Sequence, residues 1–133
     1  MMVGTEWLIE ASGCNAAALR DEAVIRSVLS SVIEDLGLQS VGSVWHKFSG
    51  AGGVTGLVAL TESHLACHTY PELGVVTFNL YCCRLRPEWP WEARLTEMLG
   101  ASRVSVRSLA RGEDVTGYEE AVLVERSHSG REG

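Results

Sequence analysis

The chain has 133 residues, the size of one ordinary domain and long enough to bury a core without disulfide or metal staples. Hydrophobic residues make up 46% of it and charged residues 21%, which indicates a folded globular protein rather than a disordered one. Its 11 basic and 17 acidic side chains give a formal charge of -6, which disfavours a nucleic-acid partner. Without a secretory signal or a run of about 18 apolar residues, we expect a cytoplasmic protein with no membrane contact.

The first elements are expected to be a strand and a long helix. Residues 3–11 are short, apolar-rich and followed by Ser12-Gly13, the pattern of a strand that ends in a turn. From Asn15 onward, apolar residues recur at spacings of three and four, and Gly37 supplies a stop. This periodicity predicts one amphipathic helix between Asn15 and Gly37.

The rest of the chain is expected to be mainly strands. Runs of β-favouring residues, separated by turns, predict strands over 40–48, 54–61, 64–70 and 75–83. Pro90 and Gly100 bound a second helical pattern, because proline suits the first turn of a helix and glycine suits its end. A strand pattern resumes over residues 102–110.

This order of elements predicts the fold class. The strands should form a mainly antiparallel sheet with the helices on one face, which is a two-layer α+β sandwich. We expect a single domain over residues 1–126 and a small, polar, disordered tail over residues 127–133. The face of the sheet that no helix covers favours a homodimer or a binding site.

Histidine and cysteine gather in the middle of the chain. Four of these residues, Cys67, His68, Cys82 and Cys83, are of the types that bind zinc. Adjacent cysteines on a strand point to opposite faces, however, and no C-x2-C knuckle is present. We therefore expect no metal, and the simplest interpretation of each cysteine alone is a small buried core residue.

Several short motifs follow one another along the chain. They are WHKF at 45–48, GVTG at 53–56, ESH at 62–64, HTYPE at 68–72 and a thiol at position 83. In this arrangement the chain resembles the short prokaryotic form of S-adenosylmethionine decarboxylase, a pyruvoyl-dependent enzyme made as a self-processing proenzyme. The resemblance covers most of the chain, because the order of helices and strands also fits.

The resemblance implies that the chain cuts itself between Glu62 and Ser63. The Ser63 hydroxyl would attack the Glu62 carbonyl, and elimination from the resulting ester would turn Ser63 into a pyruvoyl group. The base that takes the Ser63 α-proton is implied to be His68. Thr55 matches a family hydroxyl that assists this processing.

The resemblance also implies the steps that follow the cut. The pyruvoyl group is the expected cofactor and forms a Schiff base with the amine of a small-molecule substrate. Cys83 is implied as the acid that protonates the decarboxylated carbon, and Cys82 as a structural residue. The two fragments, a β chain of residues 1–62 and an α chain of residues 63–133, are expected to stay associated around one core.

The substrate that the resemblance implies is S-adenosylmethionine, which would place the chain in spermidine and other polyamine biosynthesis. The family holds adenine between aromatic side chains, here Phe48 and Tyr70, and the ribose hydroxyls on a glutamate, here Glu72. The chain also departs from the family near this pocket. Tyr70 replaces a common tryptophan, Asn79 replaces an aspartate and Arg84 replaces a glycine.

Two alternatives stay open. Glu6 stands where a basic residue is common, and its carboxylate could bind a cationic guanidinium or ammonium group. This residue supports a second hypothesis, a pyruvoyl-dependent arginine or ornithine decarboxylase of the same family. The third hypothesis is a non-catalytic paralogue that binds an active relative, and the intact Ser63, His68 and Cys83 argue against it.

Overall fold

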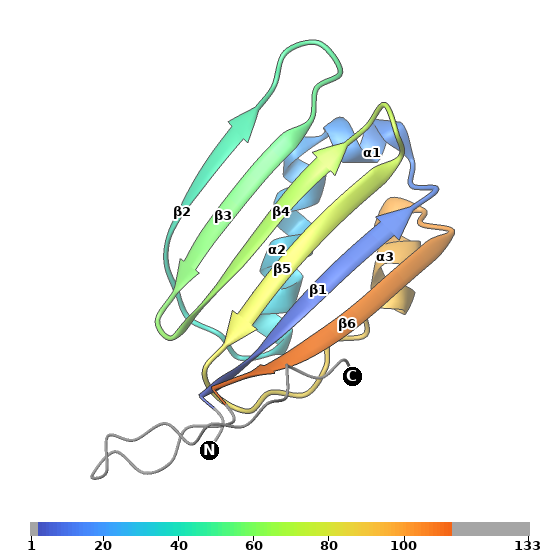
Figure 1. Ribbon diagram of the computed structural model, residues 1–133. Coiled ribbons are helices and arrows are strands. Elements are labelled where there is room, and N and C mark those ends of the chain that lie inside the picture. The colour runs from blue at the N-terminus through green and yellow to red at the C-terminus, as the bar shows by residue number, and fades with distance from the viewer. Residues whose placement is uncertain (1–2, 113–133) are drawn as a thin grey trace, which may run out of the picture.

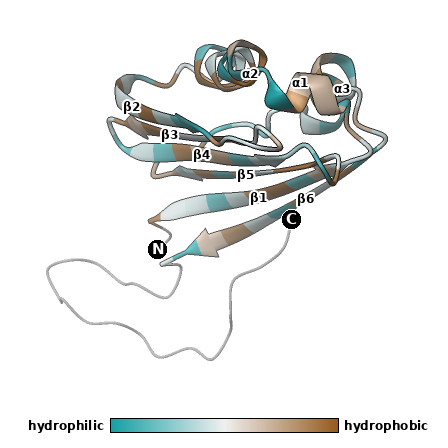
Figure 2. Ribbon diagram, turned by 90° about the horizontal axis from the view of Figure 1, so that it is seen from above, coloured by the Kyte–Doolittle hydropathy of each residue, from teal (hydrophilic) through white to brown (hydrophobic). Residues whose placement is uncertain are grey.

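The structure, a computed structural model, describes residues 3–112. They form a six-stranded antiparallel sheet with three helices on one of its faces (Figures 1 and 2). The strands are β1 (Gly4–Ser12), β2 (Ser40–Lys47), β3 (Val54–Leu60), β4 (Ser63–Tyr70), β5 (Val75–Cys82) and β6 (Arg103–Arg111). The helices are α1 (Ala16–Arg20), α2 (Glu22–Asp35) and α3 (Trp91–Leu99). The predicted α+β sandwich is confirmed, whereas the expected tail at 127–133 and the end of the expected domain lie outside the described residues.

The strands do not follow one another in chain order across the sheet. Their order is β2-β3-β4-β5-β1-β6, so the first strand lies between the fifth and the last (Figure 1). β1 pairs along its length with both neighbours, and Ile9, for example, lies opposite Phe78 on one side and Val106 on the other. The parts of the chain before and after position 63 are therefore interleaved in one sheet.

The long helix expected between residues 15 and 37 is two helices, so the prediction of a single helix is wrong. Asp21 separates α1 from α2 with an extended backbone (φ -93°, ψ 103°). Its Oδ1 accepts hydrogen bonds from the backbone N–H groups of Ala23 (3.0 Å) and Val24 (3.4 Å). These bonds satisfy groups that would lack partners at the start of α2. The apolar spacing continues on both sides of Asp21, and it therefore concealed the break.

The helices and one face of the sheet make the core. Helix α3 begins after Pro90 and ends at Gly100, as predicted, and Gly100 has the left-handed φ of 70° that glycine adopts without strain. No helix in the described part of the chain is long and apolar enough to cross a bilayer. The core residues include Trp7, Ile9, Ile25, Val28, Leu29, Val32, Leu65, Phe78, Leu80, Trp91, Leu95 and Leu99.

The opposite face of the sheet, which we call the open face, carries no helix in the described residues (Figure 2). Side chains alternate strictly along β4, so that Leu65 and Cys67 are buried beneath the helices while His64 and His68 are exposed. The strands thereby direct one residue in two from each strand onto the open face. Most of the side chains of the candidate site lie on this face or at its ends.

Candidate active site

Glu62, Ser63 and Cys83 meet at one end of the sheet, which we call the cleavage end. Ser63 begins β4 and lies opposite Cys82, the last residue of β5. Glu62 belongs to the short turn between β3 and β4, and Cys83 directly follows β5. All three border a hollow of about 230 Å³. The pairing of β4 with β5 thus brings the expected scissile bond close to the expected proton donor.

Of the two adjacent thiols, Cys83 is exposed and Cys82 is buried. Tyr81 shares the face of Cys83 and makes a side-chain hydrogen bond with it; burial first, and then the contact with Cys83, raise the pKa of Tyr81. Gly4 leaves room for this ring, since a Cβ at that glycine would lie 2.5 Å from the Tyr81 hydroxyl oxygen. Cys83 is therefore the accessible thiol, which is compatible with the role predicted for it.

Thr55 and His68 lie opposite each other on β3 and β4, toward the other end of the open face, which we call the His68 end. Thr55 Oγ1 and His68 Nδ1 are 3.1 Å apart and hydrogen-bonded. Both side chains border a hollow of about 290 Å³ together with Phe48, Tyr70 and Glu72. The structure thus gathers around one hollow five of the residues expected for processing and substrate binding, but not Glu6.

The two ends are far apart within one chain. Ser63 and His68 begin and nearly end the same strand, and five residues of β-strand span about 17 Å. Their side chains also point to opposite faces of the sheet. Ser63 shares the helix-covered face with Leu65, whereas His68 shares the open face with His64. The structure therefore does not bring His68 to the Ser63 α-proton of its own chain.

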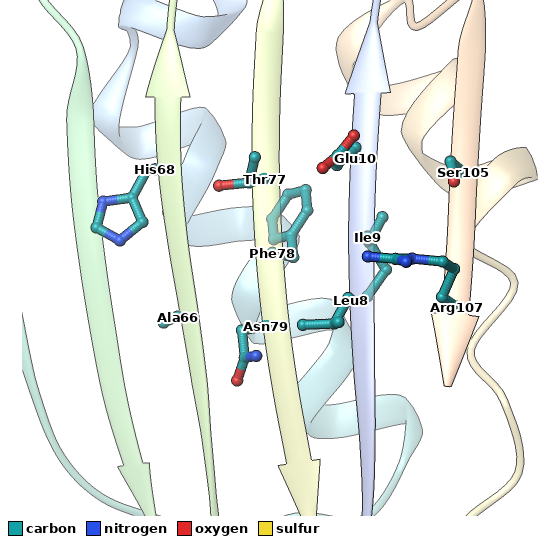
Figure 3. Close-up of a pocket in the computed structure, with 10 residues that line it drawn as sticks. All are labelled: Leu8, Ile9, Glu10, Ala66, His68, Thr77, Phe78, Asn79, Ser105 and Arg107. Carbon is teal, nitrogen blue, oxygen red and sulfur yellow. The ribbon is translucent and has the colours of Figure 1, made fainter. Parts of the chain in front are cut away.

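A third hollow, of about 470 Å³, lies on the open face between these groups (Figure 3). His68 borders it from β4 and Asn79 from β5, while the Arg107 side chain extends from β6 across β1. His68 thus borders both this hollow and the one beside Glu72. The middle of the open face is therefore recessed, and both polar and apolar side chains line it.

Glu6 lies on the open face of β1, and its partners were not foreseen from the sequence. Asn79 Nδ2 donates a hydrogen bond to Glu6 Oε2 at 2.8 Å, and Arg111 Nη1 donates one to Oε1 at 2.6 Å. These contacts, with that of Asn79 the largest, lower the pKa of Glu6. Arg111 lies 105 positions away along the chain, and only the β1–β6 pairing reveals it. Both carboxylate oxygens are engaged by the chain itself, which weakens the argument for a cationic substrate at Glu6.

A metal site is not formed by the residues that the structure describes. Within residues 3–112, no group of three His, Cys, Asp or Glu side chains could hold a metal ion. Burial raises the pKa of Cys67 to about 12, so its thiol stays protonated, whereas zinc binds thiolate. A pyruvoyl group, by contrast, would derive from Ser63 itself. The half-buried Ser63 at a strand end, near an exposed thiol, fits that group.

Comparisons with known proteins agree with these features. The model of the S-adenosylmethionine decarboxylase family matches residues 5–112. An S-adenosylmethionine decarboxylase proenzyme of Acetivibrio thermocellus is 35% identical over 92% of this chain and 95% of its own, and one of Prochlorococcus marinus is 34% identical over 86% and 93%. The crystal structure of the adenosylmethionine decarboxylase from Aquifex aeolicus has the same fold, with a TM-score of 0.69 and 24% identity over 96% of this chain and 98% of that one. The chain belongs to the S-adenosylmethionine decarboxylase family.

Proposed function

We propose that this chain decarboxylates S-adenosylmethionine with a pyruvoyl group that it makes from Ser63 by cutting itself after Glu62. The observation that carries the proposal is that Ser63 and the exposed Cys83 border one hollow at the paired ends of β4 and β5. The family membership makes the chain a carboxy-lyase, and its relatives are named for adenosylmethionine. These names favour that substrate over arginine or ornithine, and an enzyme over a non-catalytic paralogue.

The cut begins with attack of Ser63 Oγ on the Glu62 carbonyl carbon, which converts the peptide bond into an ester and frees the Ser63 amine. A base then removes the Ser63 α-proton, and Glu62 departs with its α-carboxylate as the leaving group. The remaining dehydroalanine takes up water and releases ammonia, which leaves the pyruvoyl group on residue 63. The products are a β chain of residues 1–62 and an α chain of residues 63–133, held together by the interleaved strands.

The base is His68 of a second copy of the chain. One chain cannot supply it, because about 17 Å of strand separates its own His68 from its own Ser63. If two open faces stack about a twofold axis that runs across the strands, the His68 end of each lies over the cleavage end of the other. Apolar residues suited to such an interface are exposed there, among them Leu57, with 50% of its surface accessible, and Val44, with 68%. A homodimer in which each chain supplies His68 to the Ser63 of the other accounts for the separation of these residues within one chain. It also accounts for the exposed apolar side chains on the open face.

The substrate binds at the His68 end of the open face. Phe48 and Tyr70 are half exposed and offer aromatic faces to an adenine ring and to a positively charged sulfonium. The Glu72 carboxylate accepts hydrogen bonds from ribose hydroxyls. The pyruvoyl ketone supplies a sink for the electrons that the departing carboxylate leaves behind. Cys83 holds the proton that its thiol delivers to the product carbon, and the four free thiols fit the reducing cytoplasm.

An intact mass spectrum tests the cut directly. We expect two masses, for residues 1–62 and 63–133, with the second blocked at its N-terminus by pyruvoyl. Incubation with S-adenosylmethionine, arginine or ornithine in parallel should then release carbon dioxide from the first alone. A single uncut chain that is inert with all three substrates would refute the proposal, and release from arginine or ornithine would move the chain to the second hypothesis.

A further inference from the structure

Two arginines line the hollow at the cleavage end, and no step of the proposed reaction uses them. Arg84 holds the Glu62 side chain with two parallel contacts, from Nε to Oε1 and from Nη2 to Oε2, the latter 2.8 Å long. Arg86 borders the same hollow as Glu62 and Ser63. Its Nε is buried and has no hydrogen-bond partner among residues 3–112.

The charges at this hollow do not balance in the uncut chain. The Glu62 side chain brings one carboxylate toward two guanidinium groups, and the hydrogen bond from Arg84, followed by the fields of Arg84 and Arg86, lowers the pKa of Glu62. A cut after Glu62 adds a second carboxylate at this place, because the residue then ends its chain. Two carboxylates on Glu62 would face two guanidinium groups, one of which has an unused buried donor.

We propose that Arg84 and Arg86 form a binding site for the α-carboxylate that self-cleavage creates on Glu62. Arg84 fixes the Glu62 side chain, and Arg86 receives the new main-chain carboxylate. The inference rests on the proposed cut. It assigns the pair two effects: the guanidinium of Arg86 stabilises the carboxylate as it departs from Ser63, and the pair afterwards holds the free end of the β chain against the sheet.

The site lies where the cut would create a new C-terminus, at the end of the β chain. Thr61 and Glu62 are the only residues between β3 and β4, and the Thr61 N–H donates to the Gln39 carbonyl at 3.0 Å. After the cut this one backbone bond and the arginine contacts retain the last two residues of the β chain. Arg84 is two-thirds exposed, so its contact with Glu62 is screened by solvent, and the partly buried Arg86 is the better-placed partner for the new charge.

The test compares Arg86→Gln with the conservative Arg86→Lys and with Arg26→Gln, each in the cleaving chain and in a Ser63→Ala chain that cannot cut. Arg26 is a matched control because it pairs with Glu22 at 2.8 Å on the surface of α2. We expect Arg86→Gln to slow the cut about fivefold, the effect of losing one charge pair that solvent partly screens. Hydroxylamine, which cleaves the ester, should then release more α chain that begins with serine rather than pyruvoyl. Arg86→Lys should recover part of the rate.

Thermal melting separates this role from ordinary structural support. Arg86→Gln should lower the melting temperature of the fully cut protein by about 2–4 °C more than that of the Ser63→Ala protein. Arg26→Gln should lower both equally. Equal losses for Arg86→Gln in both proteins with an unchanged cleavage rate would overturn the inference, as would a change confined to the KM for substrate. A wild-type chain that stays uncut would refute the proposed function and this inference together. If the wild type is cut but Arg86→Gln changes neither the cleavage rate nor the difference in melting temperature, the inference alone is refuted.

Discussion

Asn79 donates its side-chain N–H to Glu6 across the β1–β5 pair at 2.8 Å. Because a carboxylate can only accept, the Asn79 amide oxygen must point the other way, toward His64 Nε2 at 3.0 Å. His64 therefore carries its proton on Nε2. Its ring also stacks on Tyr81, with ring centroids 5.7 Å apart. This chain of contacts links the residue that follows Ser63 to the partner of Cys83.

The network makes a prediction about pH. The pKa of Glu6 is lowered from its usual 4.5 by Asn79 first and by Arg111 next. A lowered native pKa stabilises the fold above the unfolded value, and this contribution disappears as the pH falls through the native value. Glu6→Gln should therefore cost roughly 1 kcal/mol in the free energy of unfolding at pH 7 and progressively less below pH 4.5. Urea unfolding of the wild type and the variant over this range measures the gap.

Glu10→Gln is the matched control, because Glu10 lies on the same face of the same strand and is exposed. It should change the free energy of unfolding little, both at pH 7 and at pH 3.5. A Glu6→Gln gap that stays constant from pH 7 to pH 3.5 would mean that the Glu6 charge contributes nothing to the fold.

The shared site predicts complementation between two defective chains. Ser63→Ala should remain uncut, and His68→Ala should cut slowly on its own because its partner also lacks the base. In a mixture that forms heterodimers, the His68→Ala chain should be cut at a rate near that of the wild type, since the Ser63→Ala chain supplies His68. Intact mass spectrometry distinguishes the two chains by their masses.

The control for this experiment is a partner that carries both substitutions, which should give no rescue. If His68→Ala is never rescued by Ser63→Ala although heterodimers form, the base lies within the same chain. In that case the strand would have to rearrange before the cut.

The hydrogen bond between Tyr81 and Cys83 predicts a role for the phenol in holding the thiol. Tyr81→Phe should leave the cut intact and lower kcat about three- to tenfold, because the Cys83 thiol loses the hydrogen bond that positions it. The rate at which iodoacetamide alkylates Cys83 in the Ser63→Ala background should change as well, because the phenol no longer contacts the sulfur. Peptide mapping reads Cys83 selectively because the other three thiols are buried, and Cys83→Ala gives the blank. Unchanged alkylation and unchanged kcat would exclude this role.

A stability prediction concerns Gly53, the first residue of the GVTG motif. A Cβ at this position would lie 2.7 Å from the backbone oxygen of Thr69, which cannot move easily because the Thr69 hydroxyl is tied to Val54 N and Leu19 O. Gly53→Ala should therefore cost about 1–3 kcal/mol by denaturant unfolding. Gly42→Ala is the control, since a Cβ there meets nothing within 4 Å, and it should be close to neutral. An equally small loss at Gly53 would show that the strands can separate at little cost.

Local features of this fold could be predicted from the sequence because they depend on neighbouring residues. Alternation along a strand suffices to assign His64, Cys67 and His68 to their faces of β4, and Pro90 with Gly100 predicted the limits of α3. The break at Asp21 was missed because an aspartate in a helical pattern usually lies on its solvated side. The place of β1 in the sheet depends on pairing over long sequence distances, which no local pattern encodes.

The candidate site divides in the same way. The motifs named its residues, but they could not show that Ser63 and His68 lie at opposite ends of a strand. Nor could they show that Arg84 holds Glu62 or that Arg111 holds Glu6, since each contact depends on how two strands pair or end. Alternation along β5 does place Tyr81 on the face of Cys83, and this signal could have identified Tyr81 from the sequence.

The position of β1 also sets an order of events in time. This strand is made before the other five strands of the sheet, yet its two neighbours, β5 and β6, are made last. Its apolar Trp7 and Ile9 have no neighbouring strand to join until then. Pairing between strands that lie far apart in the sequence slows folding and prolongs the exposure of apolar surface. A chain severed at residue 63 before β1 has docked would have to find its other half by diffusion. If the chain cuts itself after Glu62, folding must be faster than the cut. The cut protein, once unfolded, should then refold with a yield that depends on its concentration.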